Sequence, residues 1–157
     1  MYRDMDYLIM AGNFAKRETG CTKVAVGSVI TNDKLLVAVG ANRAIPCLCQ
    51  TDRGCLRVEK YGDNAKTHRN PDDCRAIHSE IDAICSAAKT GESVQGGTIY
   101  VTRYPCEACA RAIVAAGIKT VVFGRSQDIS EQTKAIFETA GVSYRKCEEY
   151  QEDDTVV

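Results

Sequence analysis

Residues 98–123 read TIYVTRYPCEACARAIVAAGIKTVVF, and this stretch decides the fold. Thr98–Thr102 combines β-branched and aromatic residues and predicts a strand. A proline suits the first turn of a helix over residues 105–116, and Gly117 closes that helix. Lys119–Phe123 predicts the next strand. A strand, a helix and a strand in this order indicate a parallel pair joined by a right-handed crossover.

The segments on either side extend this pattern. Apolar spacing predicts further helices, and the valine-rich runs that flank Asn32-Asp33 predict a hairpin. Asp128 with Glu131 resembles a capping box for a helix that ends near Ala140. The other expected elements are helices over Asp4–Arg17 and His78–Lys89 and strands over Val24–Ile30, Leu35–Gly40 and Val142–Cys147. This order predicts an α/β fold, a three-layer α/β/α sandwich around a mixed five-stranded sheet.

Length and composition favour one domain. The chain has 157 residues and a formal net charge of −1, which indicates neither disorder nor a general attraction to nucleic acid. We expect a single domain over 1–147, with a cysteine-rich insert at 41–75 that shows no sustained period, and an acidic, frayed tail over 148–157. No apolar run reaches the roughly 18 residues of a membrane span. The N-terminus is acidic where a signal peptide is basic, and nine cysteines favour a reducing compartment, so we expect a cytoplasmic protein.

Two short motifs carry the chemistry. His78-Ser79-Glu80 reads H-x-E, and Pro105-Cys106-Glu107-Ala108-Cys109 reads P-C-x-x-C. One imidazole and two thiolates can hold zinc and leave its fourth position open, as in catalytic sites. Both motifs open predicted helices, whose dipoles favour thiolates, and cysteines three residues apart share a helix face. The combination is the signature of zinc-dependent nucleobase deaminases, and a purely structural zinc site is the alternative.

The motif predicts hydrolytic deamination. Zinc lowers the pKa of a bound water towards neutrality and so supplies a hydroxide-like nucleophile. Glu80 is the expected proton shuttle, which takes a proton from that water and returns it to the ring nitrogen and then to the leaving ammonia. His78, Cys106 and Cys109 are the expected zinc ligands.

The chain resembles the deoxycytidylate (dCMP) deaminases of the cytidine deaminase superfamily. The likeness covers roughly Cys21–Lys146 and rests on the blocks VGSVI (26–30), IHSEIDAI (77–84), GGTIYVTRYPC (96–106), AAGIK (115–119) and AGV (140–142). The resemblance implies a cytidine-deaminase-like fold, conversion of dCMP to dUMP, a small-molecule nucleotide as substrate and a homohexamer. CMP and dCTP stay open as substrates.

Several positions depart from the family pattern. Ser79 stands in place of an alanine, a change expected to matter little because the backbone N–H of this residue would meet the base. Asp82 stands where asparagine is usual, and residues 40–46 read GANRAIP where the family tends to read G-Y-N-G-x-P. By resemblance Asn42 would bind the sugar. The other candidate substrate contacts, each with surface charge or packing as its alternative, are Lys23, Arg43, Arg103 and Tyr104, and Arg103 is the preferred phosphate ligand.

Other functions remain open from the residues. tRNA adenosine deaminases share the zinc motif and often carry N-R after the second strand, as Asn42-Arg43 does here. RNA binding depends on clustered lysine and arginine, whereas this chain is slightly acidic, which favours a nucleotide substrate. A deaminase of another small molecule and a non-catalytic zinc module are further alternatives.

The insert at 41–75 suggests a second, structural zinc that would hold a long loop in place. By resemblance Cys21, Cys49, His68 and Cys74 match the ligand positions of such a site, with Cys55 in reserve. The alternative is that these are reduced core thiols and an ordinary loop histidine. The remaining isolated candidates, for which packing is the expected role, are Cys85, Cys147, Tyr144 and Tyr150.

Overall fold

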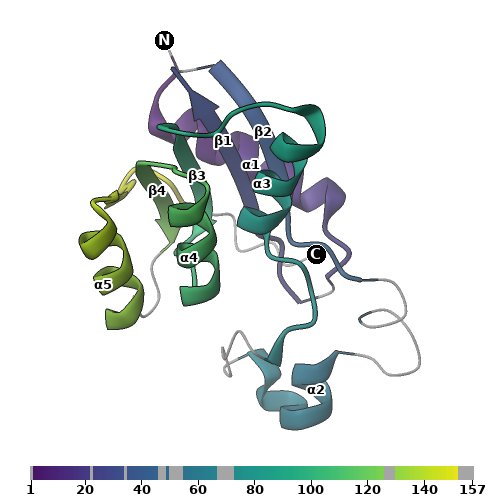
Figure 1. The fold of residues 1–157 in the computed structure, drawn as a ribbon. Coiled ribbons are helices and arrows are strands. Elements are labelled where there is room, and N and C mark those ends of the chain that lie inside the picture. Colours follow the sequence, from purple (N-terminus) through teal and green to yellow (C-terminus); the bar gives the residue numbers. More distant parts are fainter. Residues whose placement is uncertain are drawn as a thin grey trace.

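The structure, a computed structural model, describes residues 2–21, 23–33, 35–45, 49, 55–66, 73–125 and 130–151. One mixed sheet of five strands lies at its centre, in the order β2-β1-β3-β4-β5 (Figure 1). β1 is antiparallel to both β2 and β3, whereas β3, β4 and β5 run parallel. The strands are β1 (Gly27–Asn32), β2 (Leu35–Ala41), β3 (Thr98–Arg103), β4 (Thr120–Arg125) and β5 (Ser143–Lys146). The predicted mixed five-stranded sheet is confirmed.

Helices cover both faces of the sheet. α1 (Asp4–Glu18) packs on one face, where Tyr7 and Leu8 meet Val29, Tyr100 and Val122. The helices of the other face are α3 (Ser79–Thr90), α4 (Glu107–Ala115) and α5 (Glu131–Ala140). Successive strand residues point to opposite faces of the sheet. Because helices cover both faces, the residues of the central strands are buried on both sides. The predicted three-layer α/β/α sandwich is confirmed.

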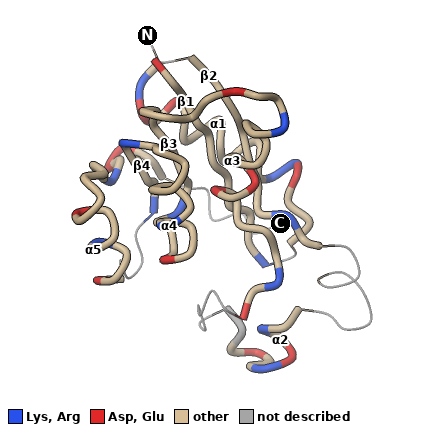
Figure 2. The backbone as a smooth tube through the Cα atoms, in the orientation of Figure 1, with Lys and Arg blue, Asp and Glu red and all other residues tan. Residues whose placement is uncertain are grey.

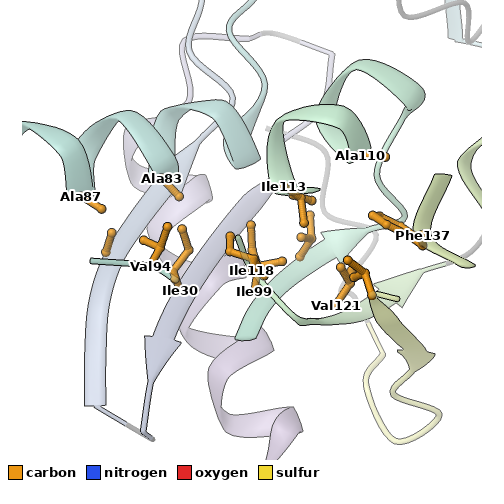
Figure 3. Packing of buried hydrophobic residues seen from close by; sticks show 13 residues of the cluster. Ile30, Ala83, Ala87, Val94, Ile99, Ala110, Ile113, Ile118, Val121 and Phe137 are labelled. Carbon is orange, nitrogen blue, oxygen red and sulfur yellow. The ribbon is translucent and has the colours of Figure 1, made fainter. Parts of the chain in front are cut away.

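The larger core lies between the sheet and the three later helices (Figure 3). Ile30, Ile99 and Val121 rise from the strands towards alanines of α3 and α4. Small residues such as Ala83 and Ala110 let the helix backbones approach the sheet closely, because they present only a methyl group. This close packing fixes where α3 and α4 begin, and both motifs lie at those two helix starts.

The helix starts differ from the sequence-based expectation. Cys106 is the extended N-cap residue of α4, so Pro105 precedes the helix and does not occupy its first turn. His78 likewise caps α3, which begins at Ser79. The cap of α5 is Ser130, whose Oγ accepts the Thr133 N–H at 3.1 Å. The predicted cap, Asp128, lies outside the described residues.

The first strand begins three residues later than predicted, at Gly27. The backbone before it is held by a side chain, because Val26 N–H donates to Asn42 Oδ1 at 2.8 Å and Asn42 Nδ2 donates to the Val24 carbonyl at 2.9 Å. These bonds replace the ladder bonds that would have extended the strand. At Gly27 a Cβ would lie 1.9 Å from the Ala11 carbonyl oxygen, so α1 rests directly on the start of β1.

The insert contains two short helical elements that its sequence did not indicate. α2 (Leu56–Tyr61) continues into the 3₁₀ helix η1 (Gly62–Lys66), and both lie beyond the end of the sheet at which α3 begins (Figure 1). None of the α2 residues is buried. Six residues are too few to show a helical period, which is why the expectation of an irregular insert was wrong here.

One prediction about an isolated residue is also corrected. Cys85 is exposed and does not lie in the core, because α3 turns Ala83 and Ala87 towards the sheet and Cys85 away from it. Tyr150 packs as expected, since its ring covers Gly124 so closely that a Cβ there would lie 2.3 Å from Tyr150 Cδ1. Cys147 is half-buried and packs, as expected, against the core cluster that α1 forms with Val29, Tyr100 and Val122. Among the described residues, every helix is too short or too polar to cross a bilayer.

Candidate active site

The starts of α3 and α4 bring three potential metal ligands together. His78 Nδ1 lies 3.5 Å from Cys106 Sγ and 3.4 Å from Cys109 Sγ. Within the described part of the chain this is the one group of at least three histidine, cysteine or acidic side chains whose ligand atoms all lie within 4.8 Å of one another. The fold therefore brings together ligand atoms from His78 and from cysteines that lie 28 or more positions away in the sequence.

Backbone contacts fix the approach to His78. The segment before α3 pairs with the end of β2 through an isolated bridge, in which Arg43 and Ile77 exchange two backbone hydrogen bonds of 2.9 Å. On the other side, Tyr104 N–H donates to the Arg125 carbonyl at 2.9 Å, which ties the chain before Cys106 to β4. Both ligand-bearing helix starts are thus tied to the sheet.

The protonation of the three ligands fits a cation site. The neighbouring Cys109 and His78 side chains lower the pKa of Cys106 to about 4, while Cys106 and burial raise the pKa of the Cys109 thiol. Hydrogen bonds to the sulfurs of Cys106 and Cys74 raise the pKa of His78 to about 10. Metal binding requires deprotonated thiolates, and one nitrogen with two sulfurs is a donor set that zinc accepts.

Glu80 lies in the first turn of α3, beside these ligands. It is 4% exposed, and burial raises the pKa of its carboxyl group while the nearby His78 opposes that rise. Its Oε2 accepts a hydrogen bond of 3.2 Å from Ser79 Oγ. The carboxyl group also contributes to the raised pKa of Cys109, so it lies within reach of the ligand group. A buried carboxyl group next to an open-position metal site is suited to moving protons.

Asn42 and Arg43 both follow β2 but have different partners. Asn42 is 6% exposed, and its amide makes the two hydrogen bonds to the backbone of Val24 and Val26 that precede the start of β1. Arg43 Nε donates to Asp82 Oδ2 at 2.8 Å, and the same oxygen accepts the Ala41 N–H at 3.0 Å. Two departures from the family pattern, at positions 43 and 82, therefore contact each other. Asp82 lies one turn along α3 from His78, so this pair borders the candidate site.

The other candidate substrate contacts lie at the end of β3 and before β1. Arg103 is half-buried as the last residue of β3, opposite Arg125 of β4. The ring of Tyr104 meets Phe123 of β4 edge-on at a centroid distance of 4.7 Å. It also lies close to Phe137 of α5 and Tyr144 of β5. Burial raises the pKa of the Tyr104 hydroxyl to about 12. Lys23 is exposed.

The predicted second zinc site is not assembled within the described ranges. Cys74 lies beside the first site, where a hydrogen bond to His78 lowers the pKa of its thiol. Among the described residues, Cys21, Cys49, Cys55 and Cys74 do not bring three ligand atoms together. His68 lies outside the described residues. The second zinc therefore stays a prediction.

The sequence did not single out Ser28. It lies on β1, 51 positions from Ser79, and the two Oγ atoms are 2.7 Å apart. Neither spacing nor a motif links these residues, and only the position of α3 over the strand brings them together. The one local signal was the serine at position 79, which had been expected to matter little.

Comparisons with known proteins place the chain in a family. The model of the MafB19-like deaminase family matches residues 3–146. ComE operon protein 2 of Bacillus subtilis strain 168 is 33% identical over 145 residues, which cover 90% of this chain and 70% of that protein. The deoxycytidylate deaminase of Mycobacterium phage D29 is 30% identical over 126 residues, 75% of this chain and 91% of that one. The chain spans 66% of the length of the human and mouse deoxycytidylate deaminases it matches.

Solved structures agree with this assignment. The dCMP deaminase of cyanophage S-TIM5, in complex with dCMP and dUMP, superposes with a TM-score of 0.70 at 25% identity. The superposition covers 94% of this chain and 99% of the phage enzyme. With the His78, Cys106 and Cys109 group and the adjacent Glu80 in place, the chain belongs to the MafB19-like deaminase family and is a deaminase of the deoxycytidylate type within the zinc-dependent cytidine deaminase superfamily.

Proposed function

We propose that this enzyme catalyses the hydrolytic deamination of dCMP, in which dCMP and water give dUMP and ammonia. The observation that carries this proposal is the ligand group of His78, Cys106 and Cys109 with buried Glu80 beside it, in a chain whose family relatives include deoxycytidylate deaminases. The complex of the cyanophage enzyme with dCMP and dUMP supports the choice of substrate and product.

His78, Cys106 and Cys109 would hold the zinc ion, and bound zinc supplies the Lewis acidity that makes a water molecule nucleophilic near neutral pH. Glu80 takes the proton of the attacking water as a new C–O bond forms at the amine-bearing ring carbon. The same carboxyl group delivers this proton to the ring nitrogen. It then takes the remaining proton of the added hydroxyl group and delivers it to the amine. The C–N bond breaks, ammonia leaves, and the ring carbon keeps the oxygen as a carbonyl.

The nucleotide would be positioned by residues around these helix starts. Arg103 and Arg43 are the proposed phosphate ligands, since guanidinium groups bind phosphate through two parallel hydrogen bonds. The backbone N–H of Ser79 would meet the base. Asn42 would bind the sugar with the remaining hydrogen-bonding capacity of its amide, which has two N–H donors and two acceptor sites.

Charge distribution supports a small substrate over RNA. Basic and acidic residues follow one another along the described backbone without a continuous basic stripe, as Figure 2 shows. The formal net charge of the whole chain is −1. Binding to a nucleic acid backbone depends on clustered cations, so this pattern gives little support to a tRNA substrate.

An ultraviolet assay of the zinc-loaded protein tests the proposal. The substrates are dCMP, CMP, dCTP, cytidine, cytosine and an adenosine-bearing tRNA stem-loop, with Glu80→Ala as the control. We expect turnover of dCMP well above that of the nucleoside and the base. Silence on every mononucleotide with activity on the stem-loop would contradict the proposal and identify an RNA deaminase.

We also propose that the enzyme is a homo-oligomer, a hexamer by the family resemblance. The outermost strand β2 exposes Leu35 and Leu36, at 72% and 53%, and apolar side chains of this kind are typical of interfaces. Light scattering measures the mass directly, and a monomer of 17.1 kDa would contradict the proposal.

A further inference from the structure

Two buried hydroxyl groups form a chain that ends on Glu80. Ser28 lies on β1 and Ser79 in the first turn of α3, and both side chains are 0% exposed. Their Oγ atoms are 2.7 Å apart, and Ser79 Oγ lies 3.2 Å from Glu80 Oε2. The first distance is that of an ordinary O–H···O hydrogen bond, whereas the second is slightly longer than the usual range, as in a weaker bond. The two serines are therefore connected to the proposed proton shuttle.

The donors in this chain can be assigned from chemistry. An ionised carboxylate only accepts hydrogen bonds, so the single Ser79 hydroxyl proton is donated to Glu80. The Ser79 oxygen is then free to accept, and the Ser28 hydroxyl donates to it. The chain runs in one direction, from Ser28 to Ser79 to Glu80.

The first member of the chain is rigidly held. Ser28 lies on a strand that pairs on both sides, opposite Gly40 of β2 and opposite Val101 of β3. The start of α3 rests on the same strands, since a Cβ at Gly40 would lie 2.3 Å from the Ser79 carbonyl oxygen. The hydroxyl of Ser28 therefore has a nearly fixed position relative to Ser79. A side chain positioned from within a sheet is more precisely placed than one on a loop.

We propose that Ser28 and Ser79 are positioning residues that orient the Glu80 carboxylate towards the metal-ligand group. The proposal rests on the function proposed above, because it assigns the serines a role in that reaction. Two buried serines could satisfy each other without a third partner, so their pairing alone would be structural. The additional contact of Ser79 with Glu80 Oε2 extends the pair to the reacting group.

Kinetics of single variants test this role. In Ser79→Ala we expect kcat to fall about tenfold, which corresponds to ~1.4 kcal/mol of lost transition-state stabilisation, with zinc content unchanged. KM should stay within about twofold, since substrate binding uses the backbone of residue 79 and an interaction made only in the transition state affects kcat. Ser28→Ala should lower kcat less, and the double variant should be no worse than Ser79→Ala, because the two hydroxyls act through one bond. Ser86→Ala, on the same helix and half-buried, is the matched control and should keep wild-type kinetics.

Crystal structures of zinc-loaded wild type and Ser79→Ala give a readout that is independent of turnover. The proposal expects one Glu80 conformer in the wild type and a rotated or split carboxylate in the variant. An unchanged kcat, or an unmoved carboxylate in Ser79→Ala, would overturn it. If the wild type fails to deaminate dCMP, the proposed function is wrong, and the carboxylate position in the two crystals still decides this inference. If Ser79→Ala does not fold, Ser28→Ala in the same two measurements decides it.

Discussion

At the scale of single residues, Glu80 combines two properties that seldom occur together. Its carboxyl group is almost completely removed from water, and the titratable side chains of His78 and Cys106 lie close enough to influence its pKa. Burial alone would disfavour its ionised form, whereas His78 and the Ser79 hydroxyl favour it. Such opposing influences are typical of groups that must both accept and release a proton.

Glu80→Gln separates proton transfer from the other roles of this side chain. Glutamine has the same shape and can still accept the Ser79 hydrogen bond, so we expect the fold and the zinc content to be unchanged. Turnover should fall by about a hundredfold to ten-thousandfold, the usual contribution of general acid–base catalysis. Steady-state kinetics with zinc analysis of the same preparation measure both quantities. Retained turnover would exclude Glu80 as the proton shuttle.

The sequence predicted the metal ligands and Glu80 better than the residues that contact and position them. His78, Glu80, Cys106 and Cys109 were identifiable because their spacing follows from the needs of a metal ion. Ser28 could not be found in this way, since its contact with Ser79 depends on how α3 lies over β1. A contact that depends only on tertiary packing, such as this one, cannot be read from the spacing of residues in the sequence.

At the scale of elements, β2 and α3 approach so closely at Gly40 that this position has no room for a side chain. At Gly40 a Cβ would lie 2.3 Å from the Ser79 carbonyl oxygen and 2.4 Å from the Ala83 nitrogen. Both of these atoms belong to the backbone of the helix that carries Glu80. Glycine at this position thus sets the distance between the sheet and the active-site helix.

Gly40→Ala should therefore damage stability and activity together. Overpacking typically costs about 1–3 kcal/mol, and backbone atoms cannot move aside as a flexible side chain can. Urea unfolding should show this loss, and kcat should fall because α3 must shift. The matched control is Gly12→Ala in α1, where the nearest atom is the tip of Tyr150 at 3.0 Å and alanine favours the helix. Equal stability of the two variants would contradict the steric explanation.

The insert is held by a polar cluster. Asp73 is 3% exposed, and it bonds to Lys60 and, at 2.7 Å, to the hydroxyl group of Tyr61, both in α2. The bonds from Lys60 and Tyr61 lower the pKa of the Asp73 carboxyl group below its ordinary value. They also raise the pKa values of Lys60 and Tyr61. An ionised carboxylate is thus one of the polar attachments of this short helix, which has no buried residue, and the ion pair between Glu59 and Arg75 is another.

Because the pKa of Asp73 is lower in the folded state, its contribution to stability is fully present above the ordinary carboxyl pKa and is lost as pH falls through the lowered value. We expect the hydrogen-exchange protection factors of α2 to be high at neutral pH and to fall in acid before those of β3 and β4. Asp73→Asn should lower the protection of α2 at neutral pH and remove most of this pH dependence. Acid-independent protection of α2 in the wild type would contradict the role of Asp73.

At the scale of the whole molecule, the order of elements and the mixed sheet followed from strand and helix periods, because long buried segments carry clear patterns. The exact ends of elements did not follow. β1 begins at Gly27 because Asn42 binds the preceding backbone, and α5 begins after Ser130 because that hydroxyl accepts the Thr133 N–H. The exact end of an element depends on contacts made by single side chains, and these contacts leave no trace in the hydrophobic periodicity that predicts the element.

The number of metal ions per chain tests how the whole molecule uses its cysteines. The sequence predicts one zinc ion at His78, Cys106 and Cys109, and the family resemblance suggests a second within the cysteine-rich insert. Fully loaded wild type should then contain about two equivalents by elemental analysis, and Cys106→Ser should lose the catalytic ion and all turnover. Cys49→Ser should lose only the second ion, with weaker protection of the insert and with Glu80-dependent turnover retained. A single equivalent in the wild type would contradict the second site, and Cys74 would then belong solely to the surroundings of His78, where its thiol already lies.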